Sequence, residues 1–64
     1  MPLNPVLEFL KAGKSPVLCL DTRNNILLLI SKEHPKDDGF GLCQISGLYY
    51  NLKNCVLLDF QFYH

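Results

Sequence analysis

The sequence has little charge, and what it has is balanced. Only 19% of its 64 residues are charged, against about 25% in an average soluble domain. Six Lys and Arg balance six Asp and Glu, so the formal net charge is zero, unlike the basic surface of a typical nucleic-acid-binding protein. Low charge together with a hydrophobic content of 48% also excludes an intrinsically disordered chain. The length predicts a single domain over residues 1–64.

Long hydrophobic segments are absent as well. The longest uninterrupted apolar run is Ile26–Ile30, whereas a membrane-spanning helix needs about 20 residues. The first residues include Pro2, Asn4 and Pro5 and no basic segment of the kind that begins a secretory signal. We therefore expect a soluble, cytoplasmic protein without a membrane partner.

No motif for catalysis or cofactor binding is present. The sequence contains no GxSxG, P-loop or dinucleotide fingerprint, and a chain of this size has little volume for a substrate pocket. The cysteines form no CxxC pair and have no zinc-ligand spacing with either histidine. We interpret Cys19, Cys43 and Cys55 as reduced, mostly buried thiols, with one disulfide and a remaining thiol as the alternative. We expect neither enzyme activity nor a metal or other cofactor.

The first segment has the features of a short helix, predicted over residues 4–12. Asn4 is a good N-cap, and Pro5 falls at the first helical position, where its missing N–H is not needed. Apolar residues recur at helical spacing as far as Leu10, and Gly13 is a typical residue just after a helix end. A helix this short is unstable alone and must pack against the rest of the chain.

The remaining sequence predicts short strands. Asn24 and Asn25 tolerate a positive φ and favour a hairpin turn between the first two strands. The polar stretch 33–41 contains a proline and two glycines and predicts an exposed loop. The predicted strands are 17–22, 26–32, 42–46, 48–52 and 55–63. The expected fold is α+β, with the helix packed on a strongly curved antiparallel sheet or a small, partly open barrel.

The last predicted strand alternates in the manner of a half-buried strand. One face carries Val56, Leu58, Phe60 and Phe62, and the other carries Leu57, Asp59, Gln61 and Tyr63.

The second predicted strand is apolar on both faces. Alternation places Ile26, Leu28 and Ile30 on one side and Leu27 and Leu29 on the other. Such a strand needs cover on both faces, and the short helix is the only additional layer. Either the sheet curls to cover the second face, or a second copy or a partner chain covers it.

This apolar surplus predicts a small, non-enzymatic interaction module. It would form a homo-oligomer or dock on a larger protein, for instance as a regulator or inhibitor. The predicted contact residues are Leu27, Leu29, Tyr50 and Phe62. The loop 33–41 is a secondary recognition element in this hypothesis.

A second hypothesis is an oligomeric binder of RNA or nucleotides. A short N-terminal helix, in segment 3–10, is followed by about five short strands that begin in segment 16–20. This order resembles that of Sm-like RNA-binding proteins, and the resemblance carries over no site residue. The candidate contacts are Arg23, Tyr49 and Lys53, which combine positive charge with an aromatic ring. The absence of a strongly basic composition disfavours a nucleic-acid partner.

A third hypothesis concerns the polar loop. His34, Asp37 and Asp38 gather metal-ligating groups within five residues. The alternative is a solvated turn in which an Asp bonds its own backbone.

Overall fold

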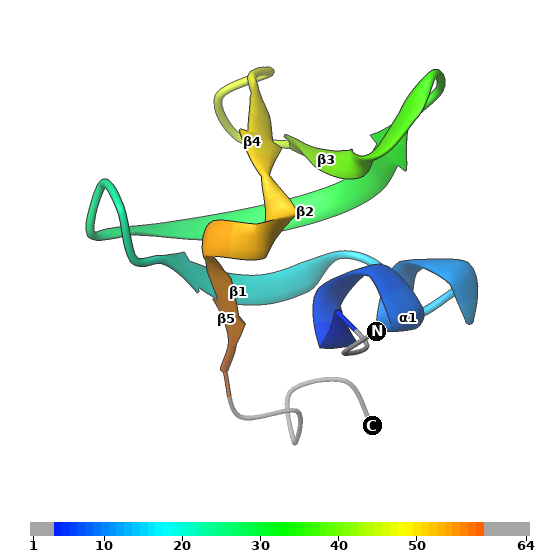
Figure 1. Ribbon diagram of the computed structural model, residues 1–64, viewed down its shortest axis with the longest axis horizontal. Coiled ribbons are helices and arrows are strands. Elements are labelled where there is room, and N and C mark those ends of the chain that lie inside the picture. Colours follow the sequence, from blue (N-terminus) through cyan, green and yellow to red (C-terminus); the bar gives the residue numbers. More distant parts are fainter. Residues whose placement is uncertain (1–3, 59–64) are drawn as a thin grey trace.

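The computed structural model describes residues 4–58, and within them it has one α-helix, one 3₁₀ turn and five strands. The elements are α1 (Pro5–Lys11), β1 (Val17–Asp21), β2 (Ile26–His34), β3 (Asp37–Cys43), β4 (Tyr49–Asn51), η1 (Leu52–Asn54) and β5 (Cys55–Leu57). The strands pair antiparallel in the order β4-β3-β2-β1-β5 and form a strongly curled half-barrel (Figure 1). The predicted α+β class, with a short helix and five strands, is confirmed.

The helix α1 begins and ends near the predicted positions. The side chain of Asn4 accepts hydrogen bonds from the backbone N–H groups of Val6 and Leu7, at 3.0 and 3.2 Å. Gly13 follows the helix with a φ of 77°, a conformation in which glycine carries no steric penalty. Val6 is fully buried, and α1 packs against β1, β2 and β5.

The core lies between α1, η1 and the inner face of the sheet. Its buried residues are Val6, Val17, Cys19, Leu28, Ile30, Cys43, Leu52 and Cys55. The 3₁₀ turn η1 connects the two edge strands β4 and β5 and contributes Leu52, which is only 1% exposed. A single side chain from η1 therefore closes part of the half-barrel.

The turn between β1 and β2 forms where the sequence predicts it. Asn25 has a φ of 55°, which asparagine tolerates better than most residues. The buried carboxylate of Asp21 accepts hydrogen bonds from the backbone N–H groups of Arg23 and Asn24 and from the Asn24 side chain, at 3.0, 3.3 and 2.8 Å. These bonds, first that of the Asn24 side chain, hold the pKa of Asp21 below its usual range although burial opposes the shift.

The predicted loop 33–41 is wrong, because most of it is strand. His34 pairs with Asp37 and Glu33 with Gly41, so that only two residues remain in the turn. Polar side chains are compatible with strand here because the backbone groups pair in the ladder while most side chains at this tip are exposed.

The boundaries of the later strands also differ from those predicted. β3 ends at Cys43 instead of residue 46, and a turn follows in which Gly47 has a φ of 75°. The predicted strand 48–52 is shorter in the structure, because β4 ends at Asn51 and Leu52 begins η1. For the predicted strand 55–63, the structure describes β5 over 55–57, and residues 59–63 lie outside the described part.

Candidate functional site

The outer face of the sheet carries aliphatic side chains on three neighbouring strands. Because side chains alternate along a strand, residues between buried ones project outward. The burial patterns of β1 and β5 follow this alternation, and that of β2 follows it over residues 27–30. The cross-strand partners on this face are Leu18 with Leu29, Leu20 with Leu27 and Leu20 with Val56. We call these five residues the outer aliphatic face.

The outer aliphatic face is incompletely covered. Leu27 is 64% and Val56 50% exposed, whereas Leu18, Leu20 and Leu29 are half-buried. Burial of one such side chain contributes about 1.5–3 kcal/mol. A contiguous exposed surface of this kind is typical of an interaction site.

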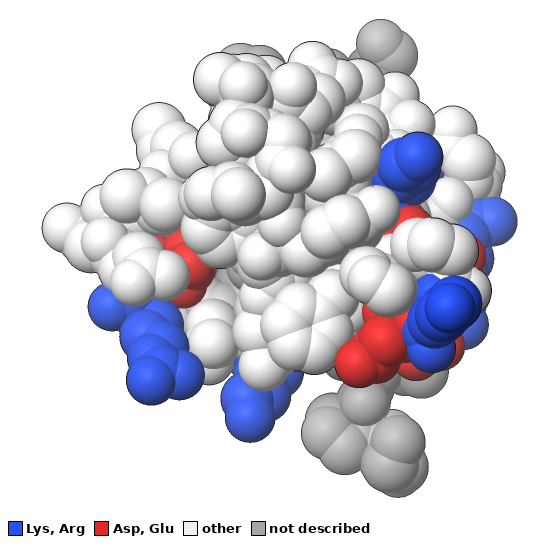
Figure 2. All heavy atoms as spheres, turned by 90° about the horizontal axis from the view of Figure 1, so that it is seen from above, with Lys and Arg blue, Asp and Glu red and all other residues white. Residues whose placement is uncertain are grey.

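A second exposed apolar element lies in the turn between β3 and β4. Ile45 is 76% and Leu48 59% exposed. The turn begins beside the outer aliphatic face, because the backbone N–H of Gln44 donates to the carbonyl of Leu29 at 2.9 Å. Seen from above, a broad part of the surface carries no charged side chain, and the charges gather at its margins (Figure 2).

The predicted contact residues do not all lie on one surface. Leu27 and Leu29 belong to the outer aliphatic face. Tyr50 packs against the core, while its neighbour Tyr49 is 40% exposed, so that the two adjacent rings take opposite sides. Phe62 lies outside the described residues.

Sequence reasoning missed part of this face. The alternation of 55–63 placed Val56 on the more apolar side, yet the structure turns Leu57 toward the core and leaves Val56 outside. The pairing of Leu20 with Val56 joins segments 36 positions apart, and no local pattern predicts it. Ile45 falls in the predicted strand 42–46, and nothing in the sequence indicates that its side chain is exposed.

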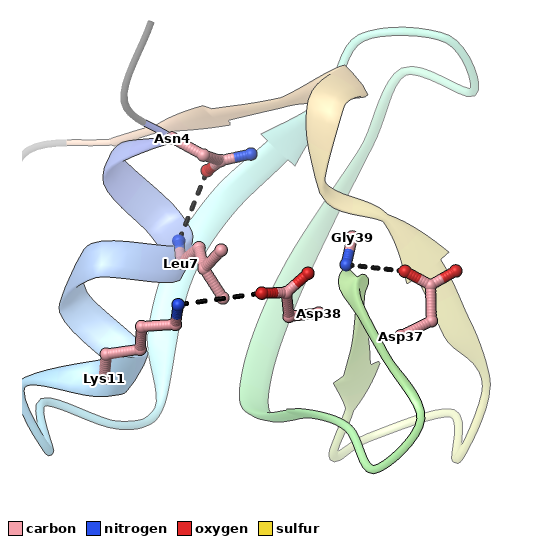
Figure 3. A network of polar contacts seen from close by, with 6 residues as sticks. All are labelled: Asn4, Leu7, Lys11, Asp37, Asp38 and Gly39. Carbon is pink, nitrogen blue, oxygen red and sulfur yellow. Dashed lines mark hydrogen bonds and ion pairs between the residues drawn. The ribbon is translucent and has the colours of Figure 1, made fainter. Parts of the chain in front are cut away.

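Three polar side chains of the hairpin between β2 and β3 have partners within the protein. Asp37 accepts a hydrogen bond from the backbone N–H of Gly39 at 2.9 Å, and Asp38 lies 3.6 Å from the ammonium group of Lys11 in α1 (Figure 3). The Nδ1 atom of His34 accepts from the backbone N–H of Lys36 at 3.0 Å. Among residues 4–58, no three His, Cys, Asp or Glu side chains are arranged to hold a metal ion.

The candidate nucleotide contacts separate into two groups. The carbonyl of Asn54 accepts hydrogen bonds from the backbone N–H and the hydroxyl of Thr22, at 2.8 and 3.0 Å. The turn that contains Arg23 therefore lies beside η1, which contains Lys53. Tyr49 lies elsewhere, with its ring 4.6 Å from that of His34 at the end of β2.

All three cysteines are free and buried. The thiol of Cys19 donates a hydrogen bond to that of Cys55, which raises the pKa of Cys19 and lowers that of Cys55. Burial raises the pKa of Cys43, but hydrogen bonds from the backbone of Ser46 and Leu29 outweigh it and leave the pKa lowered.

Comparison of the chain with models of known protein families, with curated proteins and with solved structures finds no match. Within the described part of the chain, no helix is long and apolar enough to cross a membrane.

Proposed function

We propose that this protein is a small, non-enzymatic interaction module that self-associates through the outer aliphatic face. The observation that supports this proposal is the row of Val56, Leu20 and Leu27 across three strands, with both ends exposed by half or more. A cytoplasmic location is part of the proposal, since all three thiols are free.

A second copy of the chain is the partner that fits this face. In a two-fold dimer the same patch meets itself, so a patch must not repel its own copy. The five residues of the outer aliphatic face carry no charge, so two copies of the face would not repel each other.

The area that a dimer needs is large for so small a chain. A standard interface buries about 800 Å² per partner, about a fifth of the 4469 Å² that this chain exposes. The outer aliphatic face spans three of the five strands, and the exposed turn with Ile45 and Leu48 begins at its margin. We expect the outer aliphatic face to form the centre of such an interface and the turn with Ile45 and Leu48 to lie at its margin.

Light scattering over a range of protein concentrations tests the proposal. We expect the mean mass to rise from that of one chain toward that of two as the concentration increases. High salt should leave this rise intact or strengthen it, because the face is apolar. A mass that stays at one chain up to high micromolar concentration would reject self-association, and a larger protein would then be the remaining partner for this face.

The second candidate is the oligomeric binder of RNA or nucleotides. The contact that favours it is the one between Thr22 and Asn54, which brings the segments of Arg23 and Lys53 to one end of the sheet. Binding of labelled single-stranded RNA, measured at increasing salt, tests it. Phosphate contacts predict an affinity that falls steeply with salt. Absence of binding at low salt would reject this candidate and leave the first one unaffected.

A further inference from the structure

Cys19 and Cys55 project from two adjacent antiparallel strands onto the same inner face. The register pairs Cys19 with Leu57 and Asp21 with Cys55, so the two cysteines are diagonal neighbours. Their interaction raises the pKa of Cys19 and lowers that of Cys55. The thiol of Cys55 also donates to the carbonyl of Asn51 at 3.6 Å. The proposed interaction module does not use this pair.

We propose that Cys19 and Cys55 are a reactive dithiol, which a small disulfide such as oxidised glutathione converts into a reversible cross-strand disulfide. The proposal is independent of self-association, because both side chains lie on the inner face, opposite the outer aliphatic face.

The two thiols differ in the way that such a reaction requires. Cys55 is 8% exposed and belongs to an edge strand of three residues, whereas Cys19 is completely buried in β1, between β2 and β5. Short edge strands open at a lower free energy than central ones. The interaction with Cys19 also lowers the pKa of Cys55, and the thiolate is the attacking species. Cys55 is therefore the thiol that reacts first.

The reaction proceeds by two thiol–disulfide exchanges. The Cys55 thiolate attacks one sulfur of oxidised glutathione and expels a glutathione thiolate, which leaves a mixed disulfide on the protein. The Cys19 sulfur then attacks the Cys55 sulfur and expels the second glutathione. The protons of the two protein thiols end on the two glutathione molecules, so the protein loses two electrons and the small disulfide gains them.

The position of the pair predicts a bond that is easily reduced. Diagonal residues in a sheet have Cβ atoms up to about 7–8 Å apart, whereas an unstrained disulfide needs about 3.5–4.5 Å. Closure of the bond therefore requires β5 to shift toward β1. Strained disulfides have higher reduction potentials and are the labile ones.

Cys43 is not an equivalent partner for Cys55. It lies on β3, and the strands β2 and β1 separate β3 from β5. Of the three possible disulfides, the structure therefore predicts only the one between Cys19 and Cys55.

Peptide mapping of the folded, full-length protein after incubation with oxidised glutathione tests the proposal. Cleavage after Lys and Arg places the three cysteines in separate peptides, since Arg23, Lys36 and Lys53 lie between them. Before cleavage, the unreacted thiols are alkylated. We expect one label instead of three, a linked peptide pair that contains Cys19 and Cys55, and full reversal by a mild dithiol.

The same treatment in urea supplies the control, because all three linkages become accessible in the unfolded chain. A second control is the Cys43→Ser variant, checked for its fold by circular dichroism, which should form the same bond to the same extent. Three labels in the folded protein, a stable mixed disulfide without closure, or a linkage through Cys43 would each overturn the proposal.

Discussion

Leu52 of η1 packs directly over Gly41 of β3. A Cβ atom added at Gly41 would lie 2.9 Å from Cδ2 of Leu52 and 2.5 Å from Cγ2 of Ile30. The 3₁₀ turn can thus approach the sheet only because residue 41 has no side chain. This contact fixes the crossing from β4 to β5 and, with it, the position of Val56 on the outer aliphatic face.

Gly41→Ala should therefore destabilise the protein by about 1–3 kcal/mol, as overpacking of a well-packed core does. Urea unfolding followed by circular dichroism measures the change. Gly39→Ala in the same strand is the matched control, because its added Cβ would meet only the end of the flexible Asp37 side chain, at 3.1 Å. Equal stability of the two variants would contradict the packing of Leu52 described above.

The carboxylate of Asp21 should make the stability depend on acid pH. Its pKa is lowered in the folded state, so its contribution is fully present above the pKa of the unfolded chain, 3.8. That contribution is lost as the pH falls below 3.8 and through the folded pKa. Asp21→Asn, compared with the unmodified protein by thermal unfolding between neutral and acid pH, should be less stable at neutral pH. The difference should shrink toward acid pH, and a constant difference would show that the carboxylate charge has no such role.

Loss of the helix cap should weaken α1. Asn4→Ala removes the two hydrogen bonds that the side chain accepts from Val6 and Leu7, which corresponds to about 1 kcal/mol of stability. Asn4→Asp is the matched control, because an Asp side chain caps equally well. Chemical denaturation measures both, and an unchanged Asn4→Ala variant would show that the cap is not needed.

The exposed ion pair between α1 and β3 should matter little. The side chains of Lys11 and Asp38 are 50% and 65% exposed, and pairs in water contribute about 0–1 kcal/mol. Replacing Lys11 by Met should therefore leave the denaturation midpoint nearly unchanged. A loss comparable with that of Asn4→Ala would indicate that α1 is held to the hairpin mainly by charge.

Charge on the outer aliphatic face should prevent assembly without unfolding the chain. Leu27→Lys is suited to this test because Leu27 is 64% exposed, so that the new charge stays in water in the monomer. We expect a monomer by light scattering and an unchanged circular dichroism spectrum. Ile45→Lys, with 76% exposure on the turn at the margin of the interface, is the comparison and should weaken assembly less than Leu27→Lys does. If only Ile45→Lys prevents assembly, the contact lies on the turn and the proposed face is wrong.

The sequence predicts those elements whose signals are local. The cap at Asn4, the turn at Asn25 and the opposite orientation of Tyr49 and Tyr50 follow from residue type and strand alternation, and the structure confirms them. The hairpin around Asp37 was missed because its composition is that of a loop, while ladder pairing with β2 decides its conformation. The polar composition of this segment therefore does not prevent it from forming a strand.

The candidate site was only half predictable for a related reason. Leu27 and Leu29 are recognisable in the sequence because both faces of their strand are apolar. The position of Val56 beside Leu20 depends on a chain crossing through η1, and the packing of Leu52 over Gly41 becomes visible only in three dimensions.

Intermolecular nuclear Overhauser effects in a mixed sample test the central claim most directly. Equal amounts of isotope-labelled and unlabelled protein are combined, and only contacts between different copies are recorded. We predict contacts between the methyl groups of Leu20, Leu27 and Val56 and protons of the other copy. Intermolecular contacts confined to other surfaces, or none at concentrations where the mass exceeds that of one chain, would contradict the proposed interface.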